Sequence, residues 1–370
     1  MSSSADRAGA GVDRAAGRGR RGQAPGRAGR RSRALPFSLV LASCIAVLLA
    51  SVLASFVIGR YSIPPWEAVR ILASKVLPVE QTWGALDAKV VWTIRWPRVL
   101  MAVLVGAALS CSGAAYQGVF RNPLVSPDIL GVSAAASFGA AVGILTRDAH
   151  SPLVQVLAFS FGLGGVAIAY WLARVRGTIP NVMLILAGVV VASLFNAGVS
   201  ITKYLADPYD DLPAITFWLM GSLVGMHWEN LAFAAPVILI GAAGLMAAAW
   251  RLNLLTMGDD EARSLGVNTQ RLKTIAIVCA TAMTATAVSQ CGAIGWIGLV
   301  IPHMARMLVG PDHRKLLPTA AVLGSTFLLL IDDLTRSASE TSLPLSIPIA
   351  LIGAPFFALL LRRTKAEWVQ

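Results

Sequence analysis

The sequence carries little charge for its length. Of its 370 residues, only 14% are Asp, Glu, Lys or Arg, whereas 56% are hydrophobic, and the mean hydropathy is +0.68. A soluble chain of this size needs more charge to cover its surface. The apolar residues also form runs longer than a helix of a soluble protein requires. These properties exclude a soluble domain with an unusually apolar core and predict a polytopic membrane protein.

Cysteine is scarce, and the motifs of several function classes are missing. The four cysteines are scattered without a CxxC pair, so neither a zinc site nor a disulfide framework is predicted. His303 and His313 have no companion Cys or Glu cluster, and their spacing is not that of a metal site. The sequence contains no GxxxxGK[ST] phosphate loop and no HExxH motif. We therefore expect no metal site, no cofactor bound by this chain and no enzyme activity.

Basic residues outnumber acidic ones by 31 to 19, but their placement does not favour a nucleic-acid partner. Nine arginines precede residue 35, in a stretch rich in Gly, Ala and Ser. Such a stretch cannot bury enough apolar surface to fold, so residues 1–34 are predicted to be a disordered cytoplasmic tail. The next apolar run, 35–59, is too long for the core of a signal peptide. It is therefore predicted to be a retained first span.

Hydropathy predicts an all-α protein with ten membrane spans in a domain of residues 35–363, followed by a short cytoplasmic C-terminal tail, 364–370. The expected spans are 35–59, 99–117, 129–146, 153–173, 182–204, 231–250, 271–291, 294–309, 316–335 and 347–362. With the tail inside, 22 of the 31 basic residues fall on the cytoplasmic side. This bias follows the positive-inside rule and predicts that both termini are cytoplasmic.

Small residues at helical spacing predict close contacts between spans. Gly139 and Gly143 form a GxxxG pair, and Gly106, Ser110 and Ala114 continue a row of small residues. Such rows let helix backbones approach closely where lipid provides no hydrophobic drive for association. The pattern favours a compact bundle.

Three segments between the spans are expected to form other structures. A short amphipathic helix is predicted on the outer side from Ser62, where two prolines stand at its first turn. An interfacial helix is predicted within 208–225, also outside. The charged stretch 258–266 lies on the cytoplasmic side.

Three blocks of residues form one recognisable pattern. They are Arg95-Trp-Pro-Arg98 through Arg121-Asn-Pro-Leu124 to Ser133; Gly258 through Val267; and Gly292 through His303 with Gly310-Pro-Asp-His-Arg314 and Ile352-Gly-Ala-Pro355. Together these blocks resemble one known family, the FecCD-type permeases that import ferric siderophores, haem and vitamin B12. The resemblance covers residues 35–363, in the family's order.

The resemblance implies a type II ABC importer permease in the bacterial inner (plasma) membrane. It implies two copies of this chain around a shared pathway, two ATPase subunits that bind ATP and Mg, and a soluble substrate-binding protein outside. The favoured cargo is an iron chelate, either a ferric siderophore or haem. Cobalamin remains an alternative because the same architecture serves it. An ion-coupled secondary transporter is a further alternative, although no clear internal repeat supports it.

The family's functional positions can be matched to this sequence, each with a simpler alternative. The ATPase-coupling element is expected at Gly258, Asp259, Asp260, Glu261, Ala262, Arg263, Ser264, Leu265 and Gly266. An ordinary solvated loop is the alternative. Docking of the binding protein is expected at Arg95, Arg98 and Arg336, where bidentate carboxylate contacts would be available. Snorkelling toward lipid headgroups is the alternative there.

A cytoplasmic gate is expected at Asn122, Pro123, Leu124, Ser126, Pro127 and Thr178. The prolines fix φ and remove donors, so the first of these segments is a stiff turn, and simple helix ends are the alternative. Pathway candidates are Ser193, Asn196 and Ser200 on the fifth span. Bridging of neighbouring helices is the alternative for each of them.

Overall fold

The structure, a computed structural model, describes residues 36–368 apart from 60, 62, 76, 150, 175–177 and 339–342. The chain divides into two units, Met1–Pro36 and Phe37–Gln370. The predicted tail, 1–34, lies outside the described residues. In the second unit, every regular element of the described residues is helical, which confirms the expected all-α class.

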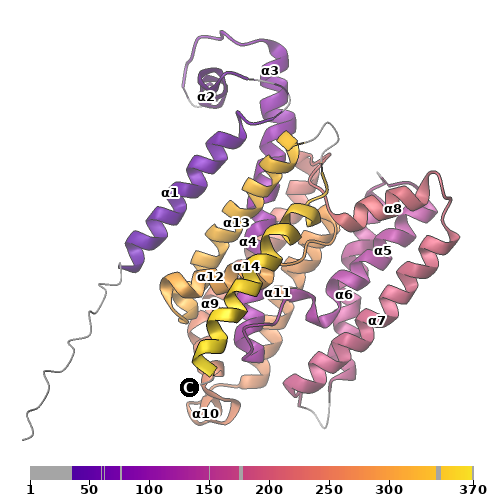
Figure 1. Cartoon of the computed structure of the whole chain (residues 1–370), viewed down its shortest axis with the longest axis vertical. Coiled ribbons are helices and arrows are strands. Elements are labelled where there is room, and N and C mark those ends of the chain that lie inside the picture. Colours follow the sequence, from indigo (N-terminus) through magenta and orange to yellow (C-terminus); the bar gives the residue numbers. More distant parts are fainter. Residues whose placement is uncertain are drawn as a thin grey trace, which may run out of the picture. The chain divides into compact units, whose positions relative to one another are not determined.

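Among the described residues, ten apolar helices follow the ten predicted spans in order, and their predicted existence is confirmed (Figure 1). Seven are long and apolar enough to cross a membrane, and three are shorter. The long ones are α1 (Phe37–Ser55), α4 (Trp96–Phe120), α6 (Pro152–Leu172), α7 (Asn181–Leu205), α9 (Trp228–Met257), α11 (Thr269–Cys291) and α13 (His313–Ala338). The shorter ones are α5 (Val132–Thr146), α12 (Ile297–Val309) and α14 (Ser346–Trp368), of which Ser346–Leu359 is the apolar part.

Helix α4 forms the centre of the bundle. It continues without a break from α3 (Ala85–Lys89) and the π-helix η1 (Val90–Arg95), and it contacts α9, α11, α12 and α13. Nearly all its side chains from Met101 onward are buried. Because α4 contains many small residues, four neighbouring helices can pack around it.

The predicted rows of small residues mark close contacts between helices. A Cβ added at Gly106 would overlap the backbone of Gly324, so α4 and α13 approach to backbone contact there. Gly139 and Gly143 of α5 lie in the same way against the backbone of α6. The prediction of a compact bundle is therefore confirmed by the pairs α4–α13 and α5–α6.

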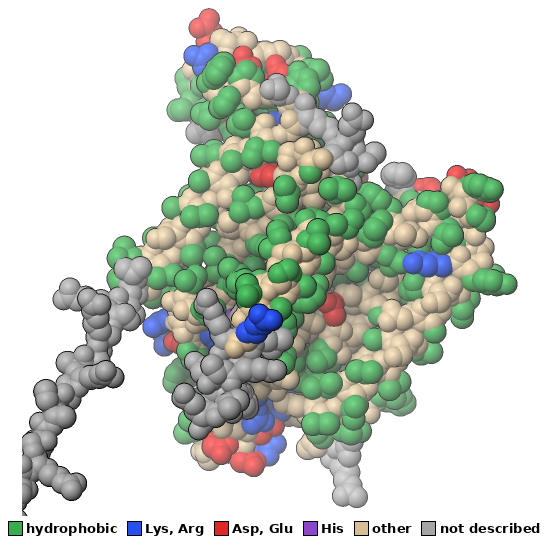
Figure 2. Space-filling view, in the orientation of Figure 1, with side chains coloured by type: hydrophobic (Ala, Val, Ile, Leu, Met, Phe, Trp, Pro, Cys, Tyr) green, Lys and Arg blue, Asp and Glu red, His purple; other side chains and the backbone are tan. Residues whose placement is uncertain are grey.

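Short elements mark the two opposite ends of the bundle (Figure 1). The end that carries α2 (Pro65–Ala73) and α3 is here called the α2 end, and the end that carries α10 (Asp259–Ser264) the α10 end. The short helices predicted after residue 62 and within 208–225 are present as α2 and α8 (Asp211–Met220). Figure 2 shows charged side chains mostly at the ends and hydrophobic ones over the surface between them.

The C-terminal boundary differs from the expected one. Helix α14 continues to Trp368, so most of the segment 364–370, predicted as a tail, extends the last helix. The charged residues after Leu361 made the hydropathy fall, but charge alone does not end a helix.

Candidate functional site

Helix α10 projects from the bundle as a short charged element. Gly258 has a φ of 142°, which L side chains rarely adopt, and a Cβ there would overlap the carboxylate of Glu261. Only glycine therefore allows α9 to end and α10 to begin within one residue. Ala262 is fully buried and anchors the helix, whereas Glu261, Ser264, Leu265 and Gly266 are exposed.

The charged side chains of α10 point in two directions. Asp260 and Arg263 form an ion pair at 3.2 Å, with side chains that are 91% and 55% exposed. Asp259 instead contacts the bundle, where it pairs with Lys273 of α11 at 2.6 Å and with Arg121 at 3.0 Å. The residues predicted for ATPase coupling thus form one exposed face and one inward contact. Their coupling role stays a prediction.

Five of the six predicted gate residues lie in the connection that follows α4, next to Arg121, which contacts Asp259 of α10. Arg121 follows the last residue of α4 and has the left-handed conformation, with φ 53°. The side-chain oxygen Oδ1 of Asn122 accepts a hydrogen bond from Leu124 N at 2.9 Å. Pro123, Ser126 and Pro127 complete the connection, and Pro127 begins the 3-10 helix η2 (Pro127–Leu130).

The η2 connection packs directly against the spanning helices. A Cβ at Gly298 of α12 would overlap the Pro127 ring, and a Cβ at Gly188 of α7 would overlap Ile129 O. Thr178 precedes α7, and its neighbour Gly177 lies outside the described residues. The structure brings the first connection onto α7, but the gating role of either connection stays a prediction.

Asp312, in the connection between α12 and α13, fastens a further pair of helices at the α10 end. Although burial raises its pKa, hydrogen bonds from Asn253 Nδ2 at 2.6 Å and from Arg314 N at 3.0 Å outweigh that effect, and the pKa lies below the ordinary value. Asn253 Oδ1 also accepts from His313 N at 2.8 Å. The charged Asp312 therefore ties α9 to the start of α13.

The three pathway candidates share one exposed face of α7. Ser193, Asn196 and Ser200 follow at spacings of three and four residues, and all three are exposed. The hydroxyls of Ser193 and Ser200 donate to Val189 O at 2.8 Å and Asn196 O at 3.0 Å, within their own helix. Among the described residues, the hydroxyls of Ser193 and Ser200 therefore bond within α7 and not to a neighbouring helix, which was the alternative for them. Their contact with cargo stays a prediction.

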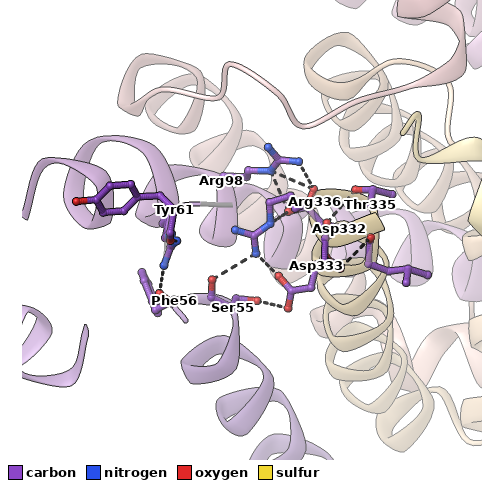
Figure 3. Close-up of polar contacts among 11 residues, drawn as sticks. Ser55, Phe56, Tyr61, Arg98, Asp332, Asp333, Thr335 and Arg336 are labelled. Atoms are coloured by element: carbon purple, nitrogen blue, oxygen red, sulfur yellow. Dashed lines mark hydrogen bonds and ion pairs between the residues drawn. The ribbon is translucent and has the colours of Figure 1, made fainter. Parts of the chain in front are cut away.

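The three arginines expected at a docking surface are largely enclosed at the α2 end. Figure 3 shows two of them, Arg98 and Arg336, in one polar cluster. Arg98 makes a bidentate contact with Asp332 of α13, with Nε–Oδ2 and Nη2–Oδ1 distances of 2.9 and 2.8 Å. Arg336 pairs with the same Asp332 at 3.3 Å and also with Asp333. Arg95 donates to the carbonyls of Phe56 and Tyr61.

This cluster differs from the expected open surface. Arg95 and Arg336 are only 4% and 8% exposed, and the Arg98 side chain is 11% exposed. In this conformation the cluster holds α1, α4 and α13 together, because Arg98 of α4 pairs with Asp332 of α13 and Arg336 of α13 donates to Ser55 O of α1 at 3.3 Å. The Ser55 hydroxyl also donates to Asp333 at 2.5 Å. Snorkelling toward lipid does not describe them either. Docking of a binding protein through these residues stays a prediction.

Several residues that organise these sites were not among the predicted functional positions. They are Lys273, Asn181, Asp332 and Asp333, and all make side-chain hydrogen bonds or ion pairs to residues far away in the sequence. For Lys273, Asp332 and Asp333, the available signal was a charged residue inside an apolar run, which commonly marks a paired or functional group. Among the described residues, no group of three or more His, Cys, Asp or Glu side chains could hold a metal ion.

Comparisons with known proteins agree on one family. Residues 47–363 match the model of the FecCD transport family. The molybdate import system permease protein MolB of Haemophilus influenzae is 39% identical, over 86% of this chain and 94% of that protein. The cobalamin import system permease protein BtuC of Halobacterium salinarum is 40% identical, over 80% and 79%. A solved structure described as an inward-facing metal-chelate type ABC transporter has a TM-score of 0.78 and 37% identity, covering 88% of this chain and 99% of that one. The chain is therefore an ABC importer permease and belongs to the FecCD transport family.

Proposed function

We propose that two copies of this chain form the membrane pathway of an importer for an iron chelate, either a ferric siderophore or haem. ATP hydrolysis takes place in separate ATPase subunits, and a soluble binding protein delivers the cargo from outside. The family's transport role and the multi-pass bundle support the permease part. The homodimer, the partners and the cargo are the parts that require experiment.

The polar face of α7 is the observation that carries the proposal. Only 22% of the most apolar window of α7 is buried inside the chain. Lipid accounts for exposed Val and Leu on such a helix, but the Asn196 amide near its middle would face hydrocarbon at a cost of several kcal/mol, about 2–7. Because polar groups at this depth normally face protein or water, we infer that a second copy and a water-accessible pathway cover this face.

The chemistry of this face favours a bulky, organically wrapped cargo. Ser193, Asn196 and Ser200 are neutral, and a small bare dianion that leaves water needs charged partners. A metal chelate presents many weakly polar groups that Ser and Asn can meet. The similarity to a metal-chelate type transporter supports the same class. Cobalamin and molybdate are competing cargoes because relatives with those names are about equally similar.

The two ends of the bundle fit different partners. The exposed charged face of α10 offers both charge signs to ATPase subunits on the cytoplasmic side, and the α2 end would then meet the binding protein. With the arginine-rich tail on the cytoplasmic side, as the positive-inside rule favours, ten spans would bring the C-terminus to the same side.

Water accessibility of α7 tests the pathway directly. Asn196→Cys should react with a membrane-impermeant thiol reagent in native membranes, whereas Leu194→Cys should not. Leu194 is a suitable control because it lies on the same helix and is 67% exposed, but faces another direction. The wild-type chain serves as the control for labelling of the four native cysteines. If Asn196→Cys and Leu194→Cys are equally protected from the thiol reagent, the polar face does not line a pathway.

Cargo and energy source require a transport assay. Right-side-out vesicles that contain the complex are loaded with ATP and supplied with binding protein. They should then accumulate a ferric hydroxamate or haem, but not cyanocobalamin or molybdate. Preferred uptake of cobalamin or molybdate would contradict the proposed cargo but would still support the permease function. Uptake driven by an ion gradient without ATP would overturn the whole proposal.

A further inference from the structure

Lys273 is a charged amine buried one turn inside α11. It is 5% exposed, and its Nζ donates to Asp259 Oδ2 at 2.6 Å and to Asn181 Oδ1 at 3.0 Å. A buried charge that loses its partner is strongly destabilising. The position of the Lys273 side chain is therefore fixed by one residue of α10 and one of α7.

Asn181 is the first residue of α7 and is bound on both sides. Its Oδ1 accepts from Lys273, and its Nδ2 donates to Val119 O, in the last turn of α4, at 3.0 Å. Ile179, two residues before Asn181, donates from its backbone N–H to Gln270 Oε1 of α11 at 3.4 Å. The end of α7 nearest α10 is thus held mainly through side chains of α11.

Asp259 is the residue of α10 that joins this network. Its second carboxylate oxygen accepts from Arg121 Nη2 at 3.0 Å, and Arg121 begins the predicted gate connection. Its neighbour Asp260 is 91% exposed and pairs only within α10. One carboxylate therefore contacts both the start of α7, through Lys273, and the end of α4.

We propose that Asp259, Lys273 and Asn181 form a link through which α10 positions the end of α7 that lies nearest to it. A displacement of α10 that removes Asp259 leaves the Lys273 charge without its carboxylate. Because a buried Lys273 charge without a carboxylate is strongly destabilising, the Lys273 side chain moves together with Asp259 when α10 moves. Asn181, which accepts a hydrogen bond from Lys273, then moves with it. These three are positioning residues, because none touches cargo or nucleotide. The inference rests on the proposed function in assuming that ATPase subunits move α10 and that α7 lines the pathway.

The physical link is tested on this chain alone, in lipid nanodiscs, by hydrogen exchange of the α7 amides 184–188. Asp259→Asn should accelerate their exchange by about fivefold, an effect typical of coupling residues. Asp260→Asn is the matched control and should leave the same amides unchanged, because its side chain faces solvent. If Asp259→Asn leaves exchange in α7 unchanged, the link does not exist.

A second variant covers the case in which Asp259→Asn fails to fold. Lys273→Met removes the buried charge with a side chain of similar length, and the Asp259 carboxylate, which is 28% exposed, keeps Arg121 as a partner at 3.0 Å. We expect an unchanged melting temperature but the same faster exchange in α7. Lys315→Met, at an exposed lysine of α13, is its control. A lower melting temperature with unchanged α7 exchange would assign Lys273 a purely structural role and overturn the proposal.

The functional arm uses the complex isolated with its ATPase subunits. Lys273→Met should retain ATP hydrolysis but transport about fivefold less ferric chelate per ATP, whereas Lys315→Met should match the wild type. Normal transport by a Lys273→Met complex with altered α7 exchange would overturn the positioning role. If even the wild-type complex imports no cargo with ATP, the proposed function fails, and the exchange experiment still decides whether the link exists.

Discussion

Asp332 holds most of the polar cluster at the α2 end in place. Its side chain is fully buried and pairs with Arg98 and Arg336. Asp332→Asn should lower the free energy of unfolding by about 3–5 kcal/mol, because two buried guanidinium groups lose their shared carboxylate. Thermal unfolding in detergent measures the effect. Asp260→Asn, at a 91% exposed side chain, should shift stability by less than about 1 kcal/mol. Equal shifts in the two variants would contradict this account of the cluster.

The sequence shows only part of this cluster. Asp332 and Asp333 stand four and three residues before Arg336, a spacing that allows ion pairs on one helix. The pairing of Arg98 with Asp332, by contrast, joins residues 234 positions apart, and no local pattern records it. Arg95 and Arg98 therefore resembled outward-facing docking residues, whereas the tertiary fold encloses them.

At the scale of the helices, the contact of α4 with α13 depends on Gly324. A Cβ there would overlap Ser110 Oγ and Gly106 O. Gly324→Ala should therefore separate the two helices and reduce stability by about 1–3 kcal/mol, as overpacking does. Gly164→Ala is the matched control, since nothing lies within 4 Å of its Cβ position. Thermal unfolding of both variants checks the prediction. If Gly324→Ala is as stable as the wild type, α4 and α13 can adjust to the added methyl group without loss of stability.

Helix α10 leads to a prediction about assembly. Replacing Glu261 and Arg263 together by Ala removes two exposed charged groups while leaving the buried Ala262 anchor intact. We expect recovery of ATPase subunits with the affinity-purified chain to fall about tenfold, a loss of roughly 1.4 kcal/mol. Glu229→Ala removes an exposed charge at the α2 end and should leave recovery unchanged. Full recovery with the double variant would remove α10 from the ATPase interface.

For the whole molecule, hydropathy predicted which segments span and in what order, but not how their faces are used. Long apolar runs bounded by charge fix the existence of each span. Their ends shifted by a few residues, as at α4, which begins at Trp96 and continues the helical segments α3 and η1 without a break. The link from Asp259 to Asn181 was not predictable, since it requires the relative positions of α7, α10 and α11. The spacing of Ser193, Asn196 and Ser200 in the sequence predicts that they share one face of α7. It does not predict that this face is exposed.

That exposed face has a consequence for the assembled molecule. If two copies surround one pathway, the α7 helices of both copies face it, so Ser193→Cys should yield a covalent dimer with a flexible bis-maleimide in native membranes. Leu39→Cys, at a 54% exposed position on α1, should remain monomeric, because that side of the chain meets lipid in the proposed arrangement. Denaturing electrophoresis separates the two results, with the wild-type chain as the baseline for its own cysteines. A dimer from Leu39→Cys but not from Ser193→Cys would place the interface on α1 and leave the Asn196 amide without a pathway to face.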